Sequence, residues 1–385
     1  MAYRFKKQIF GFLDLIRFSK IVDIRKAKLA EGSAAPLPED YRVNATARIL
    51  HPGNRKAILT EVITENADTK TYVFDLGTQM LFRAGQYVML SAKVGDGYVA
   101  RPYAVSSSPY AALREGKVAV TVKKAGFFSN WLFDNAEVGG EFAINGPSGY
   151  FHYESLKDRP LVVGVAGGSG ITPFYSMAQA IAEGSEDFRL VLFYGARTKA
   201  DLVFKEKLDA LVSDKFKVVY VLSDEEKAEF EHGFVTAELI KKYVNEDFTV
   251  MMCGPNAMYN FLDKELASIG VGGKYVKKEA NCVTNRDVKP AVYKLTVHIL
   301  DEVYEIPANA EETLLVAMER AGLHVPAMCR AGGCGYCHSK LVKGKFSIAG
   351  ADKRRLADAK FSYIHPCCSY PDSDIELIVP PQNVK

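Results

Sequence analysis

Five cysteines near the end of the chain stand in two short segments, CRAGGCGYC at residues 329–337 and HPCCSYP at residues 365–371. The first segment places Cys329, Cys334 and Cys337 with four and then two residues between them, and the second carries Cys367 and Cys368. The residues between the first three cysteines include Gly332, Gly333 and Gly335. Because glycine accepts positive φ and has no side chain, such a loop can curl closely around a group held by thiolates. The spacing predicts a metal centre with cysteine ligands.

Zinc is the first alternative for clustered cysteines. Structural zinc sites usually take two Cys-x2-Cys pairs, and this sequence has one, Cys334 with Cys337. The spacing C-x4-C-x2-C with a distant fourth cysteine instead resembles the plant-type [2Fe-2S] ferredoxins. In that family the last ligand stands four residues before a proline followed by x-Ser-Asp, and here Pro371 precedes Ser373 and Asp374. The resemblance implies these ligands, with Cys368 as a neighbour: Cys329, Cys334, Cys337 and Cys367.

The composition is that of an ordinary soluble protein, with 48% hydrophobic and 25% charged residues. A length of 385 residues suggests roughly two to four domains. The net charge of +3 is too small to indicate nucleic-acid binding. Three cysteines remain outside the predicted ligand set, Cys253, Cys282 and Cys368, and an odd remainder does not form a disulfide framework. We therefore expect a reducing compartment, the cytoplasm.

Residues 1–40 are predicted to form an N-terminal extension. Apolar residues at Phe5, Ile9, Phe12 and Ile16 recur at helical spacing, with basic residues largely elsewhere, which predicts an amphipathic helix over residues 1–30. This helix could pack on its own protein, dock on a partner subunit or lie on a membrane surface. No run of the sequence is long and apolar enough for a transmembrane helix, and no signal-peptide cleavage site is expected.

Residues 41–158 contain several short segments rich in β-branched residues with no helical pattern between them, which predicts an antiparallel β-barrel. The segment RPYA at residues 101–104 resembles the flavin-binding motif R-x-Y-[S/T] of the ferredoxin–NADP⁺ reductase superfamily. The resemblance implies that Arg101 meets a flavin phosphate, that Tyr103 lies against the isoalloxazine ring, and that Pro102 belongs to the same site. The family's hydroxyl residue beside flavin N5 is Ala104 here, which removes a side-chain hydrogen bond. Because backbone N–H groups remain, we expect flavin binding to survive, and the substitution leaves the flavin potential and the hydride-transfer rate open.

The second flavin motif of that superfamily is G-x-x-S at the start of a helix, and GFFS at residues 126–129 resembles it. Gly126 and Ser129 would then hold a pyrophosphate at the helix N-terminus. Because FMN has a single phosphate, the motif favours FAD.

Residues 159–280 change pattern, because RPLVVGVAGGSGITPF reads as a strand, a glycine-rich loop and a helix, as in nucleotide-binding α/β sheets. This loop resembles the GGTGITP loop of the reductase superfamily, which faces the pyrophosphate and nicotinamide of NAD(P)H. The predicted cofactor-binding residues of the loop are Gly167, Gly168, Gly170, Thr172 and Pro173.

Three further strand ends are expected at the same edge of this sheet, because ligands of open α/β sheets sit at the carboxyl ends of strands. Arg197 ends a YGAR-like turn, and Cys253, Gly254 and Pro255 match a C-G-P motif that places Cys253 toward nicotinamide. Ser223 is followed by Asp224, where NADPH-using relatives carry arginine. A carboxylate repels the 2′-phosphate and accepts hydrogen bonds from a free ribose, so the sequence favours NADH.

Residues 281–290 are predicted to be a linker, and residues 291–385 resemble the β-grasp fold of plant-type ferredoxins. The whole order resembles one-component reductases of the phthalate dioxygenase reductase type, also seen in reductases of hybrid-cluster proteins. We therefore expect three domains: an antiparallel flavin barrel, a parallel-sheet α/β NAD domain and an α+β ferredoxin domain.

The resemblance implies an oxidoreductase in which NADH reduces FAD, FAD reduces the [2Fe-2S] cluster, and the cluster reduces a protein acceptor. That acceptor could be an oxygenase, a hybrid-cluster protein or another complex. Ala104 and the N-terminal extension leave an alternative of a different class: a partly vestigial, non-catalytic subunit that the N-terminal helix anchors in a larger complex.

Overall fold

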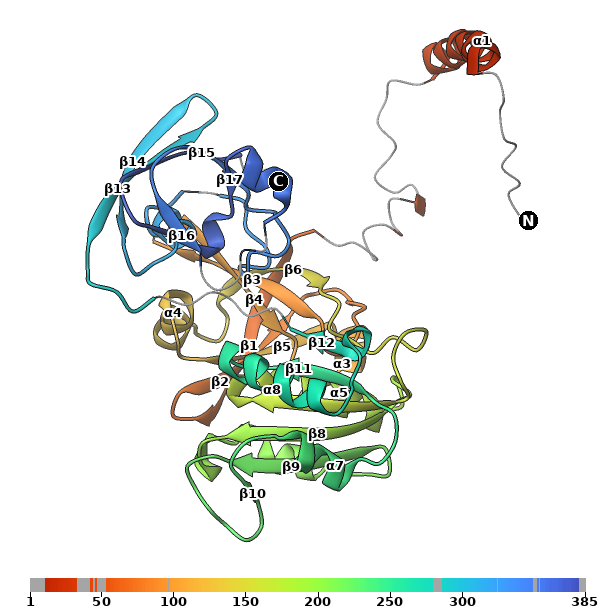
Figure 1. Cartoon of the computed structure of the whole chain (residues 1–385), viewed down its shortest axis with the longest axis vertical. Helices are drawn as coiled ribbons and strands as arrows, with labels where there is room; N and C mark the ends of the chain where they lie inside the picture. Colours follow the sequence, from red (N-terminus) through yellow and green to blue (C-terminus); the bar gives the residue numbers. More distant parts are fainter. Residues whose placement is uncertain are drawn as a thin grey trace. The chain divides into compact units, whose positions relative to one another are not determined.

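A computed structural model of the chain describes residues 11–32, 42–43, 46, 53–95, 97–279, 286–323, 325–348, 352 and 354–380. The chain divides into two units, Met1–Leu50 and His51–Lys385 (Figure 1). In the first unit, helix α1 spans Gly11–Ala30, within the predicted amphipathic segment, and exposes Ile21, Ile24 and Leu29. Residues 1–10 of that prediction lie outside the described residues. Among the described helices, none has the length and apolar character needed to cross a bilayer.

The second unit begins with a six-stranded antiparallel sheet in the order β4-β3-β6-β1-β2-β5. Its strands are β1 (Arg55–Asn66), β2 (Thr69–Asp75), β3 (Tyr87–Val94), β4 (Gly97–Ala104), β5 (Lys117–Lys123) and β6 (Glu141–Ser148). A bridge between Val105 and Val120 joins the end of β4 to β5 and closes the sheet into the predicted barrel. Aliphatic and aromatic side chains such as Leu59, Tyr72 and Phe74 fill its interior. Helices α3 (Pro109–Glu115) and α4 (Phe127–Asn135) follow β4 and β5.

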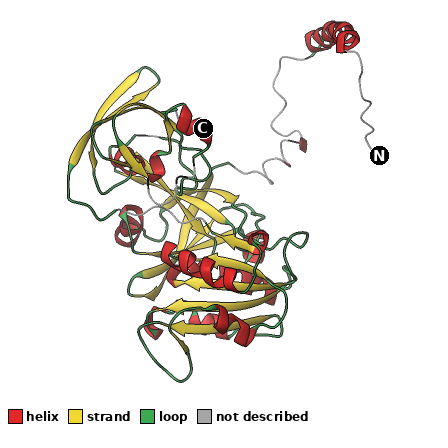
Figure 2. Cartoon of the chain, in the orientation of Figure 1, coloured by secondary structure: helices red, strands yellow, loops and turns green. Residues whose placement is uncertain are grey.

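The middle part is a parallel sheet in the order β10-β9-β8-β7-β11-β12. The strands are β7 (Leu161–Gly167), β8 (Arg189–Ala196), β9 (Phe216–Leu222), β10 (Glu231–His232), β11 (Thr249–Cys253) and β12 (Val276–Lys278). Figure 2 shows helices on both sides of the strands. Helices α5 (Thr172–Ala182) and α6 (Lys205–Asp209) share the core of one face, and α7 (Ala237–Tyr243) and α8 (Asn256–Ser268) share that of the other. The nearly continuous apolar runs of β7, β8 and β11 follow from burial on both faces.

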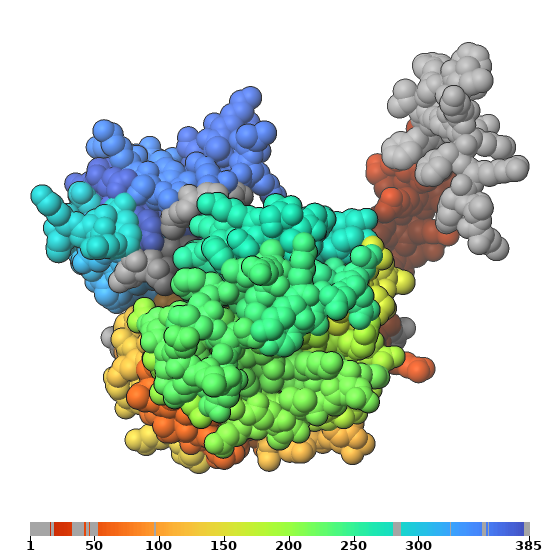
Figure 3. Space-filling model, turned by 60° about the horizontal axis from the view of Figure 1, so that its bottom comes forward, coloured from red at the N-terminus to blue at the C-terminus, as the bar shows by residue number. Residues whose placement is uncertain are grey.

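The strand order of this sheet reverses at β7. The chain runs from β7 to β8 and β9 on one side, and returns to place β11 on the other side of β7. Short 3-10 helices η1 (Gly168–Ile171), η2 (Lys199–Asp201) and η3 (Gly273–Tyr275) lie in the connections. In the view of Figure 3, the side chains of this part form one continuous green surface.

The C-terminal part is a five-stranded mixed sheet in the order β14-β13-β19-β15-β17, with a small second sheet of β16 and β18. The elements are β13 (Val292–Ile299), β14 (Glu302–Asn309), α9 (Leu314–Arg320), β15 (Ser339–Lys343), β16 (Phe346–Ile348), α10 (Leu356–Lys360), β17 (Tyr363–Ile364), η4 (Pro366–Cys368), β18 (Ser369–Pro371) and β19 (Ile375–Ile378). The predicted hairpin is β13 and β14, and α9 packs its Leu314, Leu315 and Met318 into the core. The segment between α9 and β15 is the cysteine loop.

The first half of the predicted linker, residues 281–285, lies outside the described residues, which resume at Arg286. The Arg286 side chain donates hydrogen bonds to the carbonyl oxygens of Ala310 and Pro371 and binds Asp372. This part of the predicted linker is therefore fastened to the C-terminal part of the chain. The exact domain boundaries remain a prediction.

Candidate functional site

The two segments that resemble flavin motifs begin 25 residues apart in the sequence. In the fold they come together where β4 of the barrel contacts α4. Arg101, Pro102, Tyr103 and Ala104 are half-buried residues of β4, and Arg101 and Tyr103 pair in register with Leu90 and Val88 of β3. The Tyr103 ring lies 6.5 Å from the ring of Phe128, and the Arg101 guanidinium lies 6.0 Å from the same ring. Because α4 begins directly after Gly126, this contact brings its N-terminus beside the arginine.

The Ser129 hydroxyl is occupied by the cap of α4. It accepts hydrogen bonds from the backbone N–H groups of Ala125 and Gly126 at 3.0 and 2.8 Å and donates to the Gly126 carbonyl at 3.0 Å. A hydroxyl has one donor and two acceptor positions, so these three bonds use its capacity. A phosphate at this turn would therefore meet backbone N–H groups of the first helical turn, which have no partner within a helix. The serine holds the turn in shape.

The serines that follow RPYA connect the flavin strand to the parallel-sheet part. Ser176 and Gln179 of α5 donate hydrogen bonds to the carbonyl oxygens of Ser107 and Ser106, at 2.7 and 2.9 Å. Helix α5 begins at the glycine-rich loop, so these bonds join the segment that follows β4 to the helix that follows that loop. Hydride transfer requires a flavin and a nicotinamide in direct contact, and this connection fits that requirement.

The glycine-rich loop and the C-G-P turn are in close contact at the carboxyl edge of the sheet. A Cβ atom on Gly167 would lie 2.9 Å from Pro255, and one on Gly170 would lie 1.9 Å from the Cys253 carbonyl oxygen. Gly168 has a φ of +54°, and the hydroxyl of buried Thr172 donates to the Ser169 carbonyl at 3.2 Å. Pro173 stands in the first turn of α5, and the N–H of buried Gly254 donates to the Tyr259 hydroxyl. The predicted residues of these two turns are thus assembled at one place.

Cys253 is buried in the core beneath this edge. Burial raises the pKa of its thiol, and nearby Glu279 adds to the effect. The thiol is therefore neutral at physiological pH, which fits a packing contact beside nicotinamide better than a nucleophile.

The ends of β8 and β9 lie side by side, as predicted for neighbouring parallel strands. The N–H groups of Ser223 and Asp224 donate to the carbonyl oxygens of Ala196 and Arg197, both at 3.0 Å. The Ser223 hydroxyl donates to the Asp224 carboxylate at 2.6 Å, and the side chains of Arg197 and Asp224 are exposed.

Two of the carboxylates that follow Ser223, those of Asp224 and Glu225, have different surroundings. Glu225 accepts the Lys199 backbone N–H at 2.7 Å and pairs with Lys227 at 2.5 Å, and these contacts lower the pKa of Glu225. The Glu225 carboxylate is thus bound by groups of the protein itself. Asp224 is the carboxylate that stands at the carboxyl edge of the sheet.

The four predicted cluster ligands lie in one loop and one short helix. Contacts between thiols join them in two pairs, Cys329 with Cys334 and Cys337 with Cys367. A two-iron cluster needs two thiolates for each iron, so two pairs fit it. Cys334 is the exposed member of the set.

Backbone N–H groups surround the sulfurs. Cys329 Sγ accepts from Ala331 and Cys334 at 3.5 and 3.4 Å, and Cys334 Sγ accepts from Tyr336 at 3.4 Å. Hydrogen bonding from the Cys334 thiol and these N–H groups lowers the pKa of Cys329 to about 5. Hydrogen bonds from the thiols of Cys337 and Cys368 lower the pKa of Cys367 to about 3. The same shared thiol hydrogens raise the pKa of Cys334 and Cys337, so one thiolate of each pair is stabilised. The backbone N–H groups around the sulfurs are the contacts that an iron–sulfur site would use.

The loop conformation depends on glycine at two of the three predicted positions. Gly332 and Gly335 have φ of +73° and +72°, whereas Gly333 does not have a positive φ. A Cβ on Gly332 would also lie 2.7 Å from the Cys368 sulfur, so Cys368 packs against the loop. Gly332 further accepts a 2.8 Å hydrogen bond at its carbonyl from Nδ1 of buried His365.

Three residues that shape this region were not identified from the sequence, because they belong to no recognisable motif. His365 fixes the cluster loop. Glu319 forms ion pairs with Arg101 of β4 and with Arg330. Arg330 donates a hydrogen bond to the Ala100 carbonyl of β4. Their partners are up to 230 positions away in the sequence, which is why the spacing gives no signal.

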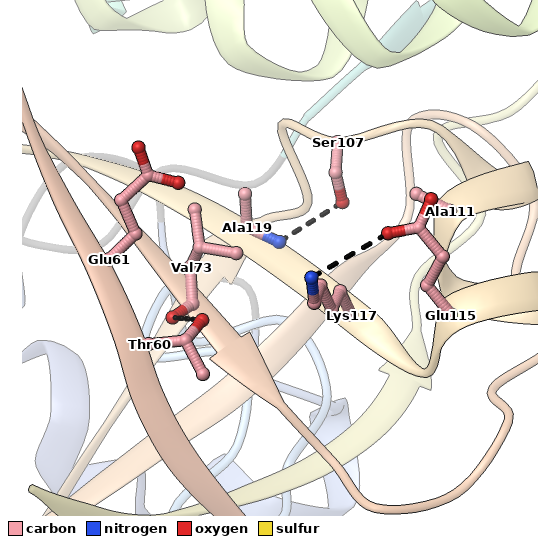
Figure 4. A pocket seen from close by; sticks show the side chains of 8 residues that line it. All are labelled: Thr60, Glu61, Val73, Ser107, Ala111, Glu115, Lys117 and Ala119. Atoms are coloured by element: carbon pink, nitrogen blue, oxygen red, sulfur yellow. Dashed lines mark hydrogen bonds and ion pairs between the residues drawn. The ribbon is translucent and has the colours of Figure 1, made fainter. Parts of the chain in front are cut away.

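A separate hollow of about 430 Å³ opens on the barrel wall (Figure 4). It is lined by Thr60, Glu61, Val73, Ser107, Ala111, Glu115, Lys117 and Ala119. Thr60 donates to the Val73 carbonyl, the Ala119 N–H donates to Ser107, and Lys117 lies 3.8 Å from Glu115. Since these polar groups bind one another and the lining contains none of the predicted cofactor residues, we do not place a cofactor there.

Three domain families match the chain. Residues 56–153 match the oxidoreductase FAD-binding domain, residues 165–264 the oxidoreductase NAD-binding domain, and residues 297–372 the 2Fe-2S iron-sulfur cluster binding domain.

Relatives and a solved structure share the same arrangement. The chain is 30% identical over 348 residues to the ferredoxin reductase component of 3-ketosteroid-9-alpha-monooxygenase from Mycobacterium tuberculosis, covering 82% of this chain and 93% of that protein. It is 27% identical over 356 residues to the glycine betaine monooxygenase reductase subunit of Chromohalobacter salexigens, covering 84% and 95%. The fold also matches that of phthalate dioxygenase reductase, with a TM-score of 0.66, 22% identity, and 85% and 98% of the two chains covered.

These matches cover all three predicted cofactor-binding parts in the predicted order. The chain belongs to the ferredoxin–NADP⁺ reductase superfamily, as an NADH-dependent flavoprotein oxidoreductase with a C-terminal [2Fe-2S] ferredoxin domain.

Proposed function

We propose that this protein is the reductase component of an oxygenase system, which takes electrons from NADH and delivers them singly to a separate oxygenase. The observation that carries the proposal is the match along most of the chain to reductase subunits of monooxygenases. When bound, the cofactors supply the redox chemistry: FAD takes a hydride from NADH and gives up electrons one at a time to the cluster. The chain's own residues bind, orient and shield these groups.

In the flavin site, the Arg101 guanidinium binds phosphate and the Tyr103 ring covers the isoalloxazine ring. Backbone groups of Pro102 and Ala104 line the same strand. The N-terminus of α4 at Gly126, shaped by Ser129, binds the second phosphate of FAD.

In the nicotinamide site, Gly167 and Gly170 let the loop pack against the C-G-P turn, because a Cβ at either position would collide with it, and Gly168 supplies a positive φ. The absence of side chains also leaves the loop backbone open to the cofactor. Thr172 and Pro173 begin α5, and Cys253, Gly254 and Pro255 form the opposite wall. Arg197 binds phosphate or ribose, and Ser223 with Asp224 accepts hydrogen bonds from the ribose, which selects NADH over NADPH.

In the ferredoxin part, Cys329, Cys334, Cys337 and Cys367 would hold the cluster, which would supply one-electron transfer. Because Cys334 and neighbouring Tyr336 are exposed, an acceptor protein would dock on this side of the site.

We place the protein in the cytoplasm, where NADH is available and thiols stay reduced. The basic and apolar surface of α1 is suited to a partner subunit or an anionic membrane surface, and deletion of residues 1–40 separates this role from catalysis. We expect the deletion to leave NADH oxidation intact.

The oxygenase assignment is tested by reconstitution. The purified holoprotein is mixed with a purified candidate oxygenase from the same genome, and NADH oxidation and oxygen consumption are recorded with and without the oxygenase substrate. We expect NADH oxidation to accelerate only when oxygenase and substrate are both present. Electron delivery to another acceptor at high rate, with none of the organism's oxygenases served, would contradict the assignment.

A further inference from the structure

Glu319 lies between two arginines at the contact of the ferredoxin part with the flavin strand. Its Oε2 lies 2.9 Å from Nη1 of Arg101 on β4, and its Oε1 accepts a hydrogen bond from Nη2 of Arg330 in the cluster loop. The side chains of Arg101, Glu319 and Arg330 are 14%, 7% and 5% exposed. A carboxylate and two guanidinium groups are thus removed from water at one point, a costly arrangement unless each charge has a partner.

A backbone carbonyl of β4 completes the cluster. The Ala100 carbonyl accepts from Nε of Arg330 at 3.0 Å and from Nη1 of Arg101 at 2.9 Å. Arg330 has a φ of +53°, an uncommon conformation for a residue with a side chain. Because Arg330 directly follows the predicted ligand Cys329, the same residue shapes the cluster loop and fastens it to β4.

The charges of Arg101, Glu319 and Arg330 also favour binding of the flavin phosphate. Two guanidinium groups against one carboxylate leave an excess positive charge beside the position assigned to a flavin phosphate. A guanidinium can bind on more than one edge, so Arg101 can hold Glu319 and a phosphate together. Without Glu319, two buried positive charges would face one another, and the contact between β4 and the cluster loop would open.

We propose that Glu319 is a positioning residue for electron transfer between flavin and cluster, because it clamps the cluster loop to the strand that binds the flavin. This inference rests on the proposed phosphate-binding role of Arg101. The step that Glu319 serves moves one electron from reduced flavin to one ferric iron, and it makes or breaks no bond in the three side chains.

Glu312 offers a matched control. It is also 7% exposed and pairs with an arginine, Arg320, at 2.5 Å, but both partners belong to the ferredoxin part. The variants Glu319→Gln and Glu312→Gln each remove one buried negative charge that is paired with arginine. They differ in whether the pair reaches the flavin strand.

The first measurement is hydrogen–deuterium exchange of the holoprotein, which does not depend on turnover. We expect the peptide that covers β4 to exchange at least fivefold faster in Glu319→Gln than in the wild type and to be unchanged in Glu312→Gln. Equal exchange of β4 in the wild type and Glu319→Gln would overturn the proposal.

The second measurement is stopped-flow reduction by NADH, after iron, sulfide and flavin contents have been matched. We expect cluster reduction to slow at least tenfold relative to flavin bleaching in Glu319→Gln, with the wild-type ratio kept in Glu312→Gln. The double variant Glu319→Gln/Arg330→Gln removes the Glu319 carboxylate together with the Arg330 guanidinium that it pairs with. It should recover part of the lost rate of cluster reduction. An unchanged ratio in Glu319→Gln, or equal loss in the control, would overturn the proposal.

The variant Arg101→Gln separates this inference from the assignment on which it rests. If Arg101→Gln retains flavin while β4 exchanges faster, the phosphate role of Arg101 is wrong and the clamp stands. If Arg101→Gln loses flavin and Glu319→Gln changes neither exchange nor the rate ratio, the phosphate role stands and the clamp is wrong.

Discussion

A Cβ atom on Gly170 would lie 1.9 Å from the carbonyl oxygen of Cys253, closer than any non-bonded contact. The glycine-rich loop and the C-G-P turn therefore fit together only while position 170 has no side chain. We expect Gly170→Ala to force the loop away from β11 and to cost at least about 1–3 kcal/mol of stability, as overpacking does. NADH-driven flavin reduction should fall with it.

Gly272 provides the control, because a Cβ there would meet no atom within 4 Å and its φ is negative. Thermal unfolding and stopped-flow reduction of Gly170→Ala and Gly272→Ala make the comparison. If both variants unfold at the wild-type temperature, the two turns are not packed as described.

The exposed carboxylate of Asp224 should determine the choice between NADH and NADPH. We expect at least a tenfold preference for NADH in kcat/KM, equivalent to about 1.4 kcal/mol at the transition state. Asp224→Arg should narrow this gap by attracting the 2′-phosphate, whereas Glu226→Arg, the same charge change two residues later, should narrow it much less. Equal efficiency of the two cofactors in the wild type would contradict the prediction.

Cys367 and Cys368 can be distinguished by single substitution. Cys367 contacts the thiol of the predicted ligand Cys337, whereas the Cys368 thiol contacts Cys367 and donates to the His365 carbonyl at 3.5 Å. Cys367→Ser should therefore lose the cluster, and Cys368→Ser should keep it, with flavin retained in both. Iron and sulfide analysis with the visible spectrum decides the matter, and equal contents in the two variants would refute the assignment.

Ala104 stands where the superfamily carries a hydroxyl beside flavin N5. Ala104→Ser should add one hydrogen bond near the reacting atom, with a net effect of about 0.5 to 1.5 kcal/mol. We expect a changed hydride-transfer rate or flavin potential with unchanged FAD content, because the phosphate contacts lie elsewhere. Stopped-flow reduction and redox titration measure the two quantities. No change in either would show that residue 104 does not face N5.

The fold was predictable from the sequence because each part has its own pattern. The short β-branched segments became the barrel, and the strand, glycine loop and helix at residue 161 onward became a parallel sheet with apolar strands buried on both faces. The hairpin before the cysteine loop formed as expected. These predictions worked because turn glycines and hydrophobic periodicity are local properties.

The interactions between the parts were not predictable in this way. The Ser129 hydroxyl is consumed by its own helix cap, which the motif alone does not reveal. Glu319 looks like an ordinary polar residue near the end of a helix, yet it pairs with an arginine 218 positions away. A buried ion pair between distant residues depends on how two folded parts meet, and a single sequence carries no local record of that contact.

Anaerobic stopped-flow spectroscopy of the purified holoprotein tests the central claim most directly. With excess NADH, the account predicts rapid bleaching of the flavin band followed by bleaching of the iron–sulfur absorbance, with one further electron taken up per cluster. A flavin that is reduced while the cluster stays oxidised, or a flavin that NADH does not reduce at all, would contradict it.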